Sequence, residues 1–135
     1  FVGIMAGVDH GILYHLVPKE RWEADRACGR PYFPPTYNQD GFIHLTKVAD
    51  RLLIVANHFY KDVPGEHIVV GIDSTKLQSE VKFEPAAPVG DKETYDSAKV
   101  ELFPHLYGTI DYEAVVQELR VSRAPDGAFL AIEGL

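Results

Sequence analysis

The sequence contains only one cysteine, Cys28, among its 135 residues. A single cysteine excludes an intramolecular disulfide, so the composition gives no support to an oxidising compartment. We expect Cys28 to be a buried structural thiol rather than a nucleophile.

The apolar runs are too short to span a bilayer, so we expect no membrane partner. We expect a cytoplasmic location, or an organelle if a targeting segment has been trimmed.

Basic residues are also scarce. The chain has 13 Lys and Arg residues against 20 Asp and Glu residues, a formal net charge of -7 at pH 7. Such a surface repels phosphate backbones unless positive charge is gathered in one place, and no run of Lys and Arg does so. A nucleic-acid polymer is therefore not expected as a partner. We expect a small-molecule ligand, and a monomer or a small homo-oligomer.

The common catalytic and nucleotide-binding motifs are absent as well. The sequence has no Walker A loop, no Gly-x-Gly-x-x-Gly, no Gly-x-Ser-x-Gly elbow and no His-Glu-x-x-His. What remains is the composition of an ordinary globular protein, with 46% hydrophobic residues. We set residues 1–10 aside as an N-terminal arm or a non-native remnant and expect one domain over residues 11–135.

Short apolar runs alternate with helical patterns along the chain. Residues 13–17, 42–45 and 67–73 are predicted as central strands, because their unbroken apolar character needs cover on both faces. Helices are predicted over 19–28 and from Thr46, as the N-cap, to about residue 60. Further strands are predicted over 80–84, 112–121 and 127–132, and loops over 30–41 and 85–100. This order predicts an α+β fold in which two helices cover a curved, largely antiparallel sheet.

Histidines in the middle of predicted strands are the most informative candidates for chemistry. His15 and His44 each lie within an apolar run, where both ring nitrogens need partners. Two interpretations stay open: a pair of core histidines bonded to backbone carbonyls, or a shared polar pocket. His105, in the turn-like segment 103–108, would join such a pocket. His10, His58 and His67 fall at element ends, where we expect them to be solvated.

Other residues are weaker candidates. Three histidines match a catalytic zinc site in number, but they are scattered singly along the chain, so we expect no metal. Glu84 is a candidate acid, base or ribose ligand, with a surface carboxylate as the alternative. The aromatic residues of the 30–41 loop, among them Tyr32 and Tyr37, either pack as a lid over the core or line a pocket.

Several blocks of the sequence occur in the order and spacing of one known pattern. They are Tyr-His-Leu-Val-Pro at 14–18, Gly-Phe-Ile-His-Leu-Thr at 41–46, Phe-Glu at 83–84 and Phe-Pro-His-Leu-Tyr-Gly at 103–108. With these blocks the sequence resembles, from about residue 11 to 121, the bacterial and plant family catalogued as domain of unknown function 952. That family's fold is similar to the ADP-ribosyltransferase superfamily, so the resemblance implies a curved, split antiparallel sheet with a cleft for a nicotinamide dinucleotide.

The resemblance also implies roles for individual residues. His15 and His44 match the histidines that one branch, which includes the RNA 2′-phosphotransferases, carries on its first two core strands. Tyr107 or Leu106 would fill the third position, and Glu84 is the candidate for the glutamate of toxin-type transferases. We therefore take His15, His44 and Glu84 as candidate catalytic residues. The candidate ligand-binding residues are His105, Tyr107, Tyr37 and Thr46.

Two classes of function follow. The first is an enzyme, or its relic, that binds NAD or an ADP-ribose compound without a metal and transfers or hydrolyses at the ribose. The imidazoles would supply orientation and hydrogen bonds to an oxocarbenium-like transition state. The alternative is a non-catalytic module that retains the fold and binds a small ligand or a protein.

Overall fold

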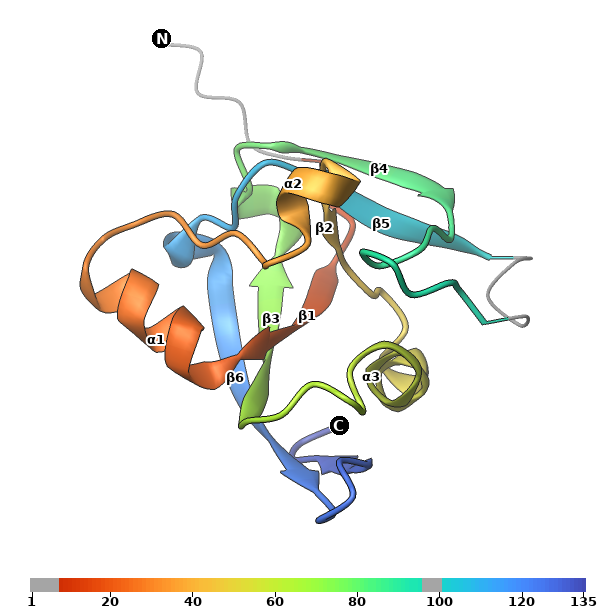
Figure 1. The fold of residues 1–135 in the computed structure, drawn as a ribbon. Coiled ribbons are helices and arrows are strands. Elements are labelled where there is room, and N and C mark those ends of the chain that lie inside the picture. The colour runs from red at the N-terminus through yellow and green to blue at the C-terminus, as the bar shows by residue number, and fades with distance from the viewer. Residues whose placement is uncertain (1–7, 96–100) are drawn as a thin grey trace, which may run out of the picture.

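The computed structural model describes residues 8–95 and 101–135, which form two antiparallel sheets with a few helices around them (Figure 1). The first sheet has the strand order β1-β3-β6-β7, and the second has the order β2-β5-β4. The strands are β1 (Ile12–Pro18), β2 (Ile43–His44), β3 (His67–Asp73), β4 (Glu80–Pro85), β5 (Leu102–Tyr107), β6 (Val115–Arg123) and β7 (Phe129–Ile132). The helices are α1 (Lys19–Ala27), α2 (Tyr37–Asp40) and α3 (Leu52–Phe59), with 3-10 turns η1 (Ala49–Arg51), η2 (Ser74–Lys76) and η4 (Tyr112–Ala114). The predicted α+β class with antiparallel sheets is confirmed. None of the helices in the described part of the chain is long and apolar enough to cross a membrane.

Strand β3 is the central strand of the larger sheet. It lies between β1 and β6, and six of its seven residues are buried. The predicted strand 67–73 therefore coincides with β3, as its continuous apolar run indicates. The other two runs predicted as central strands, 13–17 and 42–45, belong to β1 and β2, and each lies at an edge of its own sheet. That part of the prediction is wrong.

The two edge strands are apolar because they meet each other. The backbone N–H of Tyr14 donates to the carbonyl of Thr46, and the N–H of Thr46 donates to the carbonyl of Tyr14, both at 2.8 Å. Thr46 therefore links the two sheets and is not the N-cap that we predicted. The helical region begins instead at η1, whose preceding residue makes no side-chain cap, and continues as α3.

Segment 103–108 is a strand, not the turn that Pro104 led us to predict. It forms most of β5, which lies between β2 and β4. Proline has no backbone N–H to give, but the carbonyl of Pro104 accepts a hydrogen bond from the N–H of Leu45 at 3.0 Å. The register of β5 pairs His105 with His44, so the two histidines of the two motif blocks face the same way.

The predicted loop 30–41 contains one turn of helix, α2, which ends at Gly41 in a left-handed conformation. Within this segment Tyr32 is fully buried and packs edge-on against Trp22 of α1 at 5.3 Å between ring centroids. Tyr32 therefore packs into the core. Cys28, which follows α1, is exposed rather than buried, because only Trp22 of that helix reaches the core.

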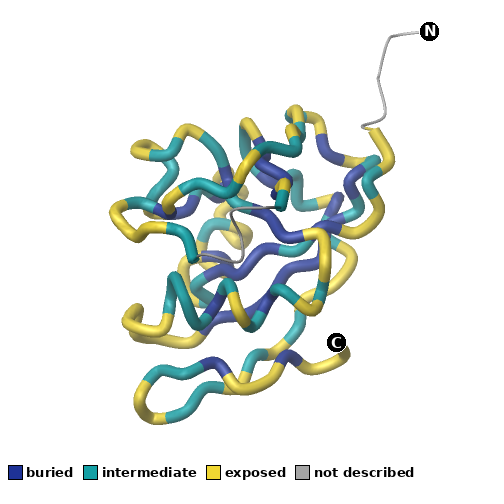
Figure 2. The backbone as a smooth tube through the Cα atoms, turned by 90° about the vertical axis from the view of Figure 1, so that its right-hand side faces the viewer, coloured by how far each residue is buried: buried dark blue, intermediate teal, exposed yellow. Residues whose placement is uncertain are grey.

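The four-stranded sheet has a hydrophobic cluster on each face. On one face, alternate residues of β1 and β3 pack with Trp22 and with the inner face of the three-stranded sheet. On the other face, Leu16 and Val69 pack with α3 and β7. Figure 2 shows these buried stretches running through the middle of the molecule between exposed turns.

The side chain of Arg123 ties the end of α3 to the C-terminal hairpin. Its guanidinium donates to the carbonyls of Tyr60, Lys61, Gly65 and Gly127, and it lies 4.2 Å from the ring centroid of Phe129. The same arrangement covers His67, which is 2% exposed rather than solvated as predicted. Its Nδ1–H donates to the carbonyl of Gly65, and the ring of Phe129 packs edge-on against it.

Replacement of Arg123 by alanine is expected to lower the free energy of unfolding by about 2 kcal/mol, because several carbonyls lose their donor at once. Urea denaturation of the wild type and of Arg123→Ala measures this difference. Arg120→Ala, an exposed arginine on the same strand, is the control and should change stability by less than about 0.5 kcal/mol. Equal losses in the two variants would contradict the anchoring role.

Candidate functional site

A cavity of about 40 Å³ opens where β1 and the β2 segment separate beyond the Tyr14–Thr46 bridge. Residues 14–16 and 44–46 supply its apex. Its other walls come from α3 and the residue after it, from one residue of β3, from segment 86–95 and from β5. These wall residues are Leu52, Val55, Phe59, Tyr60, Val69, Ala86, Ala87, Val89, Thr94, Tyr95, Phe103 and His105.

His15 lies at the apex of this cavity and is 4% exposed. Its Nδ1 is 2.7 Å from the backbone carbonyl of His44. A carbonyl oxygen only accepts, so Nδ1 carries the proton and Nε2 carries the lone pair. This Nε2 is buried and has no hydrogen-bond partner in the described part of the chain. Burial lowers the pKa of His15 to about 4, so the ring is neutral at pH 7.

His44 is held by a carboxylate. Its Nε2 donates to Oδ2 of Asp40 at 2.8 Å, which leaves the lone pair on Nδ1. Both side chains are mostly buried, at 15% and 6% exposure. Burial lowers the pKa of His44 from its ordinary value, and the hydrogen bond and negative charge of Asp40 act in the opposite direction. The result is a neutral imidazole with a fixed tautomer.

His105 has a similar arrangement on the neighbouring strand. Its Nδ1 donates to Oε1 of Glu84 at 2.9 Å, and the hydroxyl of Tyr107 donates to the same oxygen at 2.5 Å. Burial lowers the pKa of His105, with Glu84 opposing. The two hydrogen bonds lower the pKa of the Glu84 carboxyl, which therefore stays ionised. The ring of Phe42 stacks on His105 at 4.1 Å between centroids.

The three histidines thus each use one ring nitrogen as a donor to a protein oxygen and keep the other as an acceptor. Metal-binding histidines are commonly oriented in this way. However, within residues 8–95 and 101–135 no group of three or more His, Cys, Asp or Glu side chains is placed to hold a metal ion. The lone pairs on these three rings are hydrogen-bond acceptors, and all three histidines line the cavity.

The structure brings together four of the seven predicted site residues, since His15, His44, Thr46 and His105 all line the cavity. The other three lie outside it. Glu84 stands behind His105 and acts on the cavity only through that ring, and Tyr107 is 36% exposed. Tyr37 packs against Phe33 at 4.6 Å between ring centroids.

Four residues of the site were not predicted from the sequence. Asp40 precedes the Gly-Phe-Ile-His-Leu-Thr block, and its position four residues before His44 was the only available signal. Burial and the Asp40 charge raise the pKa of Tyr60, at the end of α3, to about 12. Thr94 and Tyr95 lie in the long loop, where no periodicity assigns an environment, and their hydroxyls are buried without a hydrogen-bond partner among the described residues.

The family model described as "Protein of unknown function (DUF952)" matches residues 16–118. The chain belongs to the DUF952 family. The predicted membership is therefore confirmed, while the fold similarity to ADP-ribosyltransferases stays a prediction. No curated protein matches this DUF952 chain.

Solved structures of protein CC0527 from Caulobacter crescentus are similar to this chain. The crystal structure has a TM-score of 0.67 and 21% identity, covering 88% of this chain and 93% of that chain. The solution NMR structure has a TM-score of 0.60 and 22% identity, covering 92% of each chain. At this level of identity, the likeness establishes a shared fold.

Lowering the pH is expected to reduce the free energy of unfolding, because the pKa of His15 is lower in the folded chain than in the unfolded chain. The unfolded chain takes up a proton near pH 6.5, whereas the folded chain does so only near pH 4. Stability is therefore lost as the pH falls between these values, by about 3 kcal/mol from this group. The measurement is urea denaturation from pH 7 to pH 4 for the wild type and for His15→Gln, whose amide still donates to the His44 carbonyl. The loss should be clearly smaller in the variant, and identical losses would contradict the assignment.

Proposed function

We propose that the histidine cavity binds a part of a small ligand that carries no negative charge and that donates hydrogen bonds to imidazole nitrogens. One observation carries this proposal. Five buried side-chain polar atoms in the described part of the chain lack a hydrogen-bond partner, and three of them, His15 Nε2, Thr94 Oγ1 and Tyr95 OH, belong to residues that line this cavity. Buried polar groups are normally satisfied, so their concentration at one cavity points to a polar ligand or water there.

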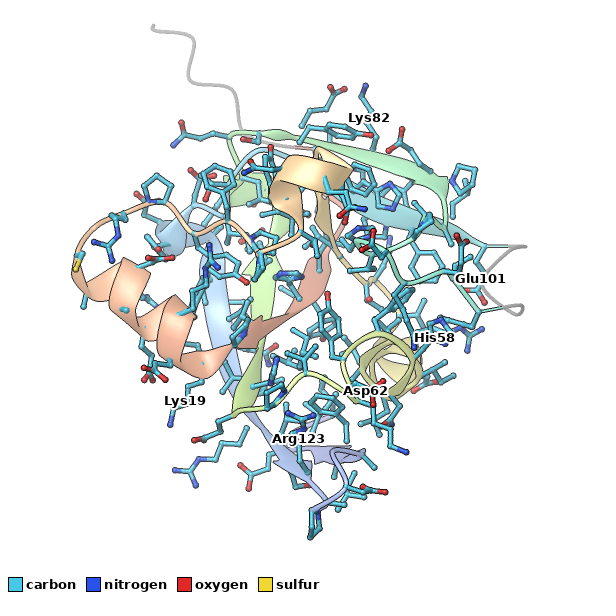
Figure 3. All side chains as sticks on the ribbon, viewed as in Figure 1. Lys19, His58, Asp62, Lys82, Glu101 and Arg123 are labelled. Atoms are coloured by element: carbon cyan, nitrogen blue, oxygen red, sulfur yellow. The ribbon has the colours of Figure 1, made fainter. Side chains whose placement is uncertain are left out.

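The charges around the cavity support a ligand without a phosphate inside it. Its described lining residues include no Lys, Arg, Asp or Glu. Lys82 and Arg123 lie at opposite ends of the molecule (Figure 3), and neither lines the cavity. Because the lining histidines are neutral, a buried phosphate would find no cation among these described residues to compensate its desolvation. A ligand amide, hydroxyl or ring N–H can instead donate a hydrogen bond to the acceptor nitrogens of the histidines.

The size of the cavity limits the ligand further. A volume of about 40 Å³ holds about three water molecules, so neither a whole dinucleotide nor a nicotinamide ring fits unless the cavity opens. Within this proposal, NAD or a related ADP-ribose compound binds by its nicotinamide–ribose end, with its pyrophosphate outside. The resemblance noted from the sequence supports this ligand class, with His15 and His44 facing the ribose.

If the ligand is transformed, transfer or hydrolysis at the ribose is the reaction that we propose. His44 is then the group best suited to move a proton, because Asp40 fixes its tautomer and opposes the effect of burial. A second function is favoured by a different observation. Among the residues that the structure describes, the lining contains no thiol and no carboxylate to act as a strong nucleophile, and binding without turnover is the alternative.

Calorimetry with nicotinamide, nicotinamide riboside and NAD, with chelator present, tests the ligand class. We expect Thr94→Val and Tyr95→Phe to weaken binding about fivefold each, the effect of one neutral hydrogen bond. Neither variant should lower the melting temperature, because each removes a buried hydroxyl that has no hydrogen-bond partner within residues 8–95 and 101–135. Tyr37→Phe, a tyrosine outside the cavity, is the matched control and should bind as the wild type does.

Two results would contradict these proposals. No heat with any of the three compounds at millimolar concentration would overturn the nicotinamide–ribose ligand class. Equal binding by the wild type, Thr94→Val and Tyr95→Phe would place the ligand elsewhere. Release of nicotinamide from NAD, followed chromatographically, separates the enzyme from the binding module: release that is lost in His44→Ala supports chemistry, and binding without release supports the module.

A further inference from the structure

The Asp40 carboxylate is shared by two parts of the cavity. It ends α2 and is nearly buried, at 6% exposure. One oxygen accepts the Nε2–H of His44 at 2.8 Å, and both oxygens accept the backbone N–H of Gly90 at 3.1 Å. A buried carboxylate with two unrelated donors holds both of them in place, because losing either would leave part of its charge unsatisfied.

The first of these contacts decides which nitrogen of His44 is an acceptor. Since an ionised carboxylate only accepts, the proton of the ring must lie on Nε2, and Nδ1 must carry the lone pair. Replacing such a carboxylate by an amide removes this preference, because the amide can donate to the ring instead. Asp40 thereby sets the tautomer of His44 without lining the cavity.

The second contact holds a wall of the cavity. Segment 86–95, here called the wall segment, runs between the three-stranded sheet and α3 and contributes five lining residues (Figure 1). Gly90 lies within it with φ at +57°, and a Cβ at this position would come within 3.0 Å of the Cγ2 of Thr36. The next residue, Asp91, accepts from the side chain of Gln39 at 2.9 Å. The wall segment is therefore fastened to α2 at neighbouring positions.

We propose that Asp40 is a positioning residue that fixes both the tautomer of His44 and the position of the wall segment. A ligand larger than about three water molecules enters only when this segment moves from α2 and the Gly90–Asp40 hydrogen bond breaks. The statement about ligand entry rests on the proposed function, whereas the double role of Asp40 does not. The Glu84–His105 pair offers a comparison in the same chain: it has the same chemistry, but Glu84 is 35% exposed and no hydrogen bond joins it to the described wall segment.

The test compares Asp40→Asn with the matched control Glu84→Gln, without any ligand. In Asp40→Asn we expect the His44 proton to move from Nε2 to Nδ1, read from the 15N shifts of the ring. The Gly90 amide should exchange with solvent at least about tenfold faster, because its buried acceptor is weakened. Glu84→Gln should alter His105 alone and leave Gly90 exchange unchanged. Two results would overturn the proposal. One is a folded Asp40→Asn protein in which the Gly90 amide exchanges as slowly as in the wild type. The other is a Gly90 exchange rate that rises equally in Asp40→Asn and Glu84→Gln.

Gly90→Ala keeps the test decisive if Asp40→Asn does not fold. The strained backbone and the close Thr36 methyl should loosen the wall segment, so that the Lys92 amide, bonded to the carbonyl of Val89, exchanges faster. His44 should keep its Nε2–H tautomer, because Asp40 is untouched. A changed His44 tautomer in Gly90→Ala would show that the wall segment, not Asp40, sets the ring. None of these measurements depends on the identity of the ligand, so their failure is separate from a failure of the proposed function.

Discussion

The pair of backbone hydrogen bonds between Tyr14 and Thr46 is the contact on which the cavity depends. It joins an edge strand of the four-stranded sheet to the segment that follows an edge strand of the three-stranded sheet. Beyond this bridge the two segments separate. There the Nδ1–H of His15 on β1 donates to the backbone carbonyl of His44 on β2. The walls from α3 and β5 then enclose the space that the diverging strands leave.

Most of the described residues that line the cavity are apolar, and its polar groups are imidazoles and hydroxyls rather than charged groups, because the two nearby carboxylates lie behind the imidazoles. Asp40 and Glu84 lie behind the rings of His44 and His105, and each accepts a hydrogen bond from one ring N–H. Their negative charge thereby orients the imidazoles but does not face the cavity. Burial keeps all three rings neutral, since an isolated imidazolium would be poorly solvated there. A site of this kind selects ligands by the direction of hydrogen bonds more than by charge.

The sequence alone indicated the α+β class, the central strand β3 and the family, because continuous apolar runs and motif blocks are local signals. It did not reveal that Thr46 pairs with Tyr14, since an edge contact between sheets has no local pattern. Pro104 concealed β5, because a proline inside a strand is rare and its carbonyl contact depends on a distant partner. His15 and His44 were found as mid-strand polar residues. Asp40, Thr94 and Tyr95 were not, since their environment is created by loops that fold over the sheets.

The order of strands has a kinetic consequence. Leu13 pairs with Ile72, and Val69 pairs with Leu119, so the main ladders of the larger sheet join segments that are far apart in the chain. Each ladder therefore requires a long loop to close before its contacts become favourable, which places such a topology among the slower two-state folders. The cavity needs both sheets and both sets of loops, so it exists only in the fully folded chain. A chain that has not yet folded leaves the edges of β1 and β2 unpaired, which makes association with other chains the main competing process.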